Sequence, residues 1–153
     1  MGKRITKIIK KSRIIHCSVD DVWWKWTTHE GLLTFFGKDN AVELKIGGKF
    51  EIYFLMENPI GLRGGEGCKI MSYLPKKMIS FTWNAPPQYP EIRNNNHKTW
   101  VVVNFEPDEN DYTRVKIFHL GWLEGELWDE VYAYFNSAWE TVLDWLEKSC
   151  ENK

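Results

Sequence analysis

The histidines come first, because imidazole is a common metal ligand and the usual acid–base group near neutral pH. The chain has four of them, His16, His29, His97 and His119. No two stand four residues apart beside a glutamate, which is the spacing of a helical zinc site. The sequence therefore predicts no metal site, and His119 is the one residue that we would name for catalysis.

His119 lies near the end of a predicted strand, on the same side as Val115 and Ile117. If that side points inward, the imidazole reaches a cavity wall and could act as a general acid or base. The alternative, which we favour, is a structural histidine that is hydrogen-bonded near the start of the last helix. Phe118 has the opposite parity, so Phe118 and His119 cannot both point inward without a bulge. The sequence leaves open which of the two does.

The sequence gives little support for a nucleophilic active site or a phosphate-binding loop. The glycine-rich segment Gly61–Gly67 lacks the Gly-Lys-Ser/Thr ending of a phosphate loop, and no helix follows it. We interpret it as a loop between strands. No Gly-x-Ser-x-Gly elbow occurs, and Cys68 is expected to pack rather than react. Arg63 and Glu66 either place charge at a cavity mouth or are solvated loop residues.

Three cysteines, Cys17, Cys68 and Cys150, are spread far apart along the chain. An odd number without a Cys-x-x-Cys pair favours neither a disulfide framework nor a zinc site. Small buried thiols in a reducing compartment are the better interpretation. We therefore expect all three thiols to be free.

Charge and hydropathy exclude several classes of partner. The formal net charge is -1 at pH 7, so nothing favours nucleic acid or an anionic membrane surface as a ligand. No apolar run approaches the roughly 20 residues that a membrane-spanning helix needs. The basic N-terminus has no apolar segment behind it and does not read as a secretory signal. We expect a cytoplasmic protein with no membrane span, and no motif predicts a cofactor.

Aromatic side chains are the best candidates for ligand contact. Tryptophan is the outlier of the composition, at 9 residues in a chain of 153, within an aromatic fraction of 15%. Ligand pockets are mostly apolar with a few polar anchors, although the same rings could simply fill a core. The residues assigned to a cavity are Phe54, Met56, Phe81, Trp83, Trp100, Phe118, Trp128, Tyr132, Phe135 and Trp139.

A long helix must position several of these rings. From Gly125 to Cys150 apolar residues recur at steps of three and four, which is the helical period. They are Trp128, Val131, Phe135, Ala138, Val142 and Leu146. So broad an apolar face needs an equally broad cover, and the rest of the chain offers mainly strands.

The remaining elements predict an α+β domain. A first strand within Ile5–Cys17 is followed by two short helices, which begin at Ser18 and Thr28. Later strands are expected at Val42–Ile46, Phe50–Met56, Gly67–Leu74, Met78–Trp83, Trp100–Phe105 and Thr113–Leu120. The long loop Asn84–Lys98 is expected to cover a binding site. The whole chain, 1–153, is expected to form a single domain in which a curved antiparallel sheet of six or seven strands wraps around the last helix.

The ordered pieces resemble the AHSA1-like (Activator of Hsp90 ATPase homologue 1-like) branch of the START/Bet v 1-like, or SRPBCC, superfamily of helix-grip domains. The resemblance covers nearly the whole chain. Its motifs are Ser18-Val19-Asp20-Asp21-Val22-Trp23, Gly47-Gly48-Lys49-Phe50, His119-Leu120-Gly121-Trp122 and Phe135-Asn136-Ser137-Ala138-Trp139. It implies the helix-grip fold, whereas the superfamily's functions range from lipid carriers and hormone receptors to hydrolases and co-chaperone domains.

Three functions are compatible with these observations. The first, which we favour, is binding of an apolar or amphipathic small molecule between the sheet and the last helix. The second, implied by the resemblance, is a co-chaperone or protein-interaction module with an Hsp90-type chaperone as partner. The third is a cyclase- or hydrolase-like enzyme that uses the same cavity, with His119 as its acid or base. Exposed tryptophans at the ends of the last helix would also be compatible with a homodimer.

Overall fold

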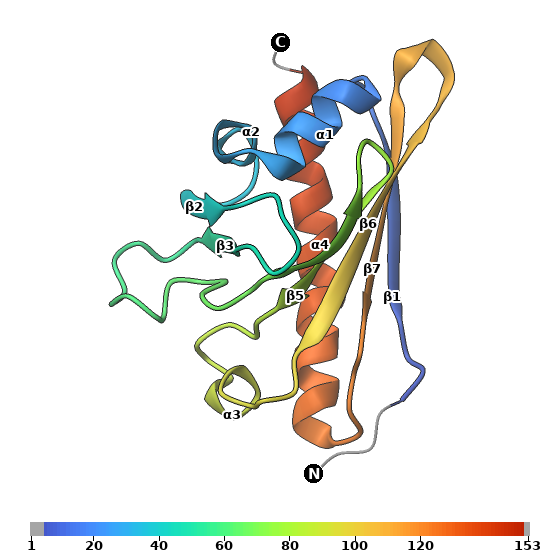
Figure 1. Cartoon of the computed structure of the whole chain (residues 1–153). Coiled ribbons are helices and arrows are strands. Elements are labelled where there is room, and N and C mark those ends of the chain that lie inside the picture. Colours follow the sequence, from blue (N-terminus) through green and yellow to red (C-terminus); the bar gives the residue numbers. More distant parts are fainter. Residues whose placement is uncertain (1–4, 152–153) are drawn as a thin grey trace.

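Seven strands and one long helix form most of the protein in a computed structural model that describes residues 5–151 (Figure 1). The strands are β1 (Ile9–Ile15), β2 (Asp39–Val42), β3 (Phe50–Tyr53), β4 (Ile70–Leu74), β5 (Met78–Trp83), β6 (Thr99–Pro107) and β7 (Thr113–Leu120). The helices are α1 (Val19–Thr27), α2 (His29–Leu33), α3 (Pro90–Arg93), the 3-10 turn η1 (Glu109–Asp111) and α4 (Glu126–Glu151).

The sheet is antiparallel throughout. Five strands follow the order β1-β7-β6-β5-β4, and β2 and β3 form a second ladder. A bridge between Lys49 and Lys69 and a hydrogen bond from Phe50 N to Cys68 O join the two ladders. The predicted α+β fold, with two short helices after the first strand, is therefore confirmed.

Short polar side chains begin the two small helices. Ser18 Oγ accepts a hydrogen bond from Asp21 N at 3.2 Å, and Thr28 Oγ1 accepts one from Gly31 N at 2.9 Å. These caps satisfy N–H groups that the first turn of a helix leaves unpaired. At Gly31 a side chain has no room, because a Cβ there would lie 2.1 Å from Trp24 O. This close approach holds α2 against α1, which crosses the upper part of α4 in Figure 1.

Strands β6 and β7 alternate strictly between buried and partly exposed residues. The inner face carries Val101, Val103 and Ile117, and it also carries His119, which is fully buried. Phe118 therefore points to the outer face. The alternation settles the question that the sequence left open, because no bulge interrupts the pairing of β7 with β6.

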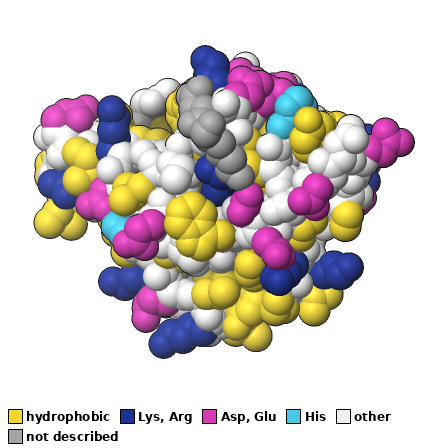
Figure 2. All heavy atoms as spheres, turned by 90° about the horizontal axis from the view of Figure 1, so that it is seen from above, with side chains coloured by type: hydrophobic (Ala, Val, Ile, Leu, Met, Phe, Trp, Pro, Cys, Tyr) yellow, Lys and Arg dark blue, Asp and Glu magenta, His cyan; other side chains and the backbone are white. Residues whose placement is uncertain are grey.

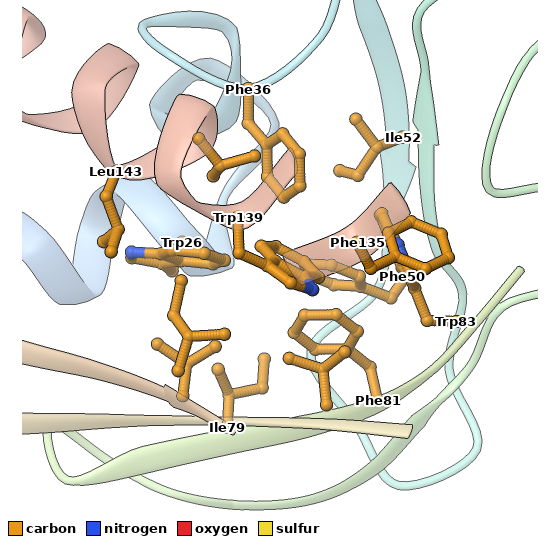
Figure 3. Packing of buried hydrophobic residues seen from close by; sticks show 14 of the residues in the cluster. Trp26, Phe36, Phe50, Ile52, Ile79, Phe81, Trp83, Phe135, Trp139 and Leu143 are labelled. Carbon is orange, nitrogen blue, oxygen red and sulfur yellow. The ribbon is translucent and has the colours of Figure 1, made fainter. Parts of the chain in front are cut away.

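Helix α4 runs the height of the molecule along the inner face of the sheet (Figure 1). Its apolar stripe is buried as the periodicity predicts, and it includes Trp128, Val131, Phe135, Trp139, Val142, Leu143 and Leu146. Figure 3 shows Trp139 at the middle of this packing, between Phe36 on one side and Phe81 on the other.

Ionic contacts fasten α4 to the edge strand of the sheet. The Arg13 guanidinium on β1 forms ion pairs with Glu140, Asp144 and Glu147 at 2.7–3.0 Å. These carboxylates stand at steps of four and three, so they share one side of the helix. Arg13 offsets the repulsion among the three carboxylates and links α4 to β1 at the edge of the sheet.

The cysteines correct one prediction. Cys17, just before α1, and Cys150, at the end of α4, form a disulfide with a Cα–Cα distance of 5.7 Å. We expected free thiols, and this was wrong because the spacing of 133 residues between the two gives no hint that they meet. Cys68 is free and buried as predicted, and desolvation raises the pKa of its thiol to about 12.

The surface is mixed in character. Seen from the end at which the C-terminus lies, acidic and basic side chains are interspersed, and hydrophobic ones gather along the lower edge (Figure 2). Among residues 5–151, no helix is both long enough and apolar enough to cross a lipid bilayer.

The disulfide predicts a measurable contribution to stability. Reducing it, or replacing both partners by serine, should lower the free energy of unfolding by about 3–5 kcal/mol, because the bond closes a long loop in the unfolded chain. Urea denaturation of the oxidised and reduced protein measures the difference. Thiol titration of the unfolded, oxidised protein should find only Cys68; three reactive thiols would contradict the pairing.

Candidate ligand cavity

A cavity of about 890 Å³ lies between α4 and the side of the molecule formed by β3, β5 and their loops. We call it the α4 cavity. Its lining comes from Phe36 after α2, from residues 54–55 and 63–65 after β3, from residues 83–84 and 86–89, and from one side of α4 between residues 130 and 145. The segments other than α4 lie to its left in Figure 1.

The floor of the α4 cavity is aromatic. Trp83 on β5 and Trp139 on α4 lie with ring centroids 5.6 Å apart, and Phe36 is 5.8 Å from Trp83. Phe54 completes the group, 5.6 Å from Phe36. Because the first three rings are almost fully buried by their neighbours, the floor is apolar and held in place by packing.

The helix wall consists of a second stripe of α4, beside the buried one. Glu130, Tyr134, Ser137, Thr141 and Trp145 recur at steps of three and four and all line the cavity. Ala133 and Ala138 lie among them. These small side chains leave the volume that larger ones would have filled.

This stripe is the part of the site that our sequence reasoning missed. We selected rings as ligand contacts, but rings also fill space, and the room beside α4 comes from alanine and serine. Alanine and serine between aromatic positions on a long helix were the available signal. The mouth remains open to solvent, since Tyr134 is 39% and Trp145 is 40% exposed.

The wall opposite the helix is built from two loops joined by Arg93. This side chain is buried, and its guanidinium donates to Gly64 O and Ala85 O at 2.7 and 2.8 Å, and to Gly61 O at 2.7 Å. It also forms an ion pair with Glu66 at 3.0 Å. One cation thus ties the glycine-rich loop to the segment that follows β5.

Glu66 receives further donors within its own loop. The backbone N–H groups of Gly61, Arg63 and Gly64 all donate to its carboxylate at 2.7–3.2 Å. Burial by itself would raise the pKa of Glu66, but these backbone hydrogen bonds together hold it below its ordinary value. Glu66 is therefore a structural anion that shapes the glycine-rich loop. The sequence had left open a charge at the cavity mouth or a solvated loop residue, and Glu66 is neither.

Two tyrosines face each other at the mouth. Tyr89, just before α3, and Tyr134 of α4 lie with ring centroids 6.1 Å apart in an edge-to-face arrangement. Partial burial, with a smaller contribution from Tyr89, raises the pKa of Tyr134. The loop predicted to cover the site thus touches α4 at this point.

Four of the ten predicted cavity residues line the α4 cavity, namely Phe54, Trp83, Phe135 and Trp139. Phe81 lies behind the floor, stacked on Phe50 with centroids 4.0 Å apart. It supports the cavity from within the core and is fully buried.

The other five point elsewhere. Trp100 and Phe118 are on the outer face of the sheet, because both belong to the partly exposed positions of β6 and β7. Trp128 packs against His97, and Tyr132 packs against Trp122 on another side of α4. Met56 lies in the exposed loop after β3 and does not line the cavity.

His119 lies in the core and outside the cavity lining. The Trp139 indole donates to its Nδ1 at 3.0 Å, so the neutral ring carries its proton on Nε2 and donates it to Thr99 Oγ1 at 2.8 Å. Desolvation lowers the pKa of His119 to about 3. Both ring nitrogens are engaged, which agrees with the structural interpretation and gives the imidazole no access to a substrate in the α4 cavity.

No metal centre is available in the part of the chain that the structure describes. Nowhere in residues 5–151 do three or more His, Cys, Asp or Glu side chains come together in a way that could hold an ion.

Comparison with known proteins identifies the family to which this architecture belongs. The family model described as Activator of Hsp90 ATPase homolog 1-like protein matches residues 16–151, which confirms the resemblance found in the sequence. No curated protein matches the chain in sequence.

Solved structures share the fold at low identity. A protein from Mesorhizobium loti superposes with a TM-score of 0.75 at 18% identity, covering 96% of this chain and 98% of its own. The Aha1 dimer from Colwellia psychrerythraea gives 0.71 at 20%, covering 95% and 97%. A protein from Bacillus halodurans gives 0.67 at 20%, covering 98% and 99%.

The buried His119 predicts a pH dependence of stability. Its pKa is depressed in the folded state, so the unfolded chain binds the extra proton first. The neutral imidazole therefore contributes fully to the free energy of unfolding above pH 6.5. That contribution falls by roughly 1.4 kcal/mol for each pH unit below 6.5, down to the folded pKa near 3. Urea denaturation between neutral and mildly acidic pH measures this slope. His119→Gln should flatten it, and an unchanged slope would contradict the assignment.

We expect the stability of the loop wall to depend on the buried ion pair of Arg93 with Glu66. Arg93→Met should lower the free energy of unfolding by about 3 kcal/mol, because Glu66 and the three carbonyl groups lose their donor. Glu91→Gln, an exposed change in the same short helix, is the control and should be neutral. Equal stability of the two variants, measured by chemical denaturation, would show that the loops hold without Arg93.

Proposed function

The chain belongs to the Activator of Hsp90 ATPase homolog 1-like family, and on this premise we propose that it binds an apolar or amphipathic small molecule in the α4 cavity. The observation that carries the proposal is the cavity itself. Its volume of about 890 Å³ lies within the range of roughly 300–1,000 Å³ that is usual for small-molecule sites.

The chemistry of the lining supports an apolar body for the ligand. A molecule that covers the exposed parts of Phe54, Tyr134 and Trp145 would remove ring surface from water, at about 25 cal/mol for each Å² buried. The rings of the floor are already fixed by their neighbours, so little order has to be gained on binding. A preformed apolar floor favours a non-covalent binding protein.

The rim supports access from one side. Tyr89 and Tyr134 meet at the mouth, and Pro86 and Pro87 stiffen the segment that leads to Tyr89. A small movement of this loop away from α4 would widen the opening. We propose that residues 84–98 gate the cavity, as the length of this loop suggested.

The two alternatives have less support. A cyclase- or hydrolase-like activity would need His119 as its acid or base, but both ring nitrogens of His119 are hydrogen-bonded within the core. Binding to an Hsp90-type chaperone is raised by the description of the family, and no feature of the cavity argues for it. The Aha1 relative from Colwellia psychrerythraea is a dimer. For this chain a homodimer is a proposal only. The exposed Trp145, which could contribute to such an interface, lies at the cavity mouth.

Filling the cavity tests the proposal. Ser137→Trp places a ring between the two walls and should weaken binding of the neutral dye Nile red at least about tenfold, because the buried area that drives binding is lost. Asn136 precedes Ser137 on α4 but does not line the cavity. Asn136→Trp is therefore the matched control, and this variant should bind the dye as the wild type does. Fluorescence titration gives both affinities, and thermal unfolding verifies that both variants are folded.

Identical Nile red binding by wild type, Ser137→Trp and Asn136→Trp would place the dye elsewhere and contradict the proposal. Absence of saturable binding to the wild type would do the same.

A further inference from the structure

The charges of the α4 cavity are few. Of the described residues that line it, Arg63 and Glu130 are the only two with a formal charge, and they stand on opposite walls. Arg63 belongs to the glycine-rich loop, whereas Glu130 lies near the start of α4 and is exposed. They do not form an ion pair with each other within residues 5–151.

Arg63 is held in place by neutral groups. Its Nε donates to Asn58 O at 2.9 Å, and its backbone carbonyl accepts from Phe54 N and Leu55 N at 2.8 and 3.0 Å. These bonds fix both the main chain and the inner end of the guanidinium. Within residues 5–151, Nη1 and Nη2 have neither a hydrogen-bond acceptor nor a carboxylate partner.

The nearest acid in sequence does not neutralise this cation. The Glu66 carboxylate accepts from the backbone N–H of Arg63 but forms its ion pair with Arg93. Arg93 in turn spends its donors on Glu66 and three carbonyl groups. The buried pair is therefore balanced by itself, and the charge of Arg63 is left for the cavity.

We propose that the ligand of the α4 cavity is an amphipathic organic anion whose acidic head group pairs with Arg63. The inference rests on the proposed function and names its ligand class. Two guanidinium N–H donors that face one way match the two oxygens of a carboxylate. An apolar body extending from that point would lie on Phe54 and Trp83, which line the same wall and floor.

Glu130 fixes the direction of binding. An anionic head group at the helix wall would meet the Glu130 carboxylate, and like charges at short range repel. At the loop wall it meets a cation whose outer nitrogens have no partner. The two walls therefore select one orientation, with the acid at Arg63 and the apolar end towards α4.

A matched pair of fluorescent probes tests this ligand class. The acid 11-(dansylamino)undecanoic acid and its methyl ester share one apolar body and differ in charge. The wild type should bind the acid at least about tenfold more tightly than the ester at neutral pH, because the ion pair forms only with the carboxylate. In Arg63→Gln the affinity for the acid should fall to that for the ester, and the affinity for the ester should stay unchanged.

Two further variants sharpen the test. Arg63→Lys keeps the charge and should retain part of the preference for the acid. Lys10→Gln removes an equal charge at an exposed position of β1 outside the cavity lining and should leave both affinities unchanged. Equal binding of acid and ester by the wild type, or equal weakening of both in Arg63→Gln, would overturn the head-group assignment while the cavity stands. Failure of both probes to bind saturably would overturn the proposed function together with it.

Discussion

The packing of α4 against the inner face of the sheet is the constraint on which the rest of the structure depends. Trp139 is at its centre, in ring contact with Trp83 and Phe36. A buried indole must also satisfy its N–H, and Trp139 does so by donating to His119, which is fixed by Thr99. This chain of hydrogen bonds orients the ring that separates the filled core from the open α4 cavity.

The C-terminal half of α4 is fastened by further contacts, which help to hold the helix as a wall of the cavity. Arg13 pairs with three carboxylates along one side, and the disulfide joins the last turn to the start of α1. On the opposite wall, Arg93 ties two loops together through Glu66. The α4 cavity is therefore bounded by two structures that are each held internally, which favours a preformed site over one built by the ligand.

Local periodicity made most of the fold predictable. The apolar stripe of α4, the caps at Ser18 and Thr28, and the alternation in β6 and β7 are properties of short segments. Long-range pairings were not predictable in this way. The bond between Cys17 and Cys150 and the ion pair of Arg93 with Glu66 depend on how the completed fold brings distant segments together.

The candidate site was predictable only in part, for a physical reason. Aromatic size suggested Trp83 and Trp139, which do form the floor, but it also suggested Trp100 and Phe118 on the outer face. Ring size says nothing of the face that a strand presents. The space itself comes from Ala133, Ser137 and Ala138, whose small side chains carry a weak signal in a sequence.

Ligand binding in the α4 cavity can be followed directly by a nuclear magnetic resonance titration that monitors the indole N–H signals of the nine tryptophans while decanoate is added. We expect saturable shifts of Trp83, Trp139 and Trp145, which line the α4 cavity, and unchanged signals from Trp24 and Trp100, which do not. Shifts confined to Trp24 and Trp100, or no saturable shift at all, would contradict the claim that the α4 cavity is a ligand site.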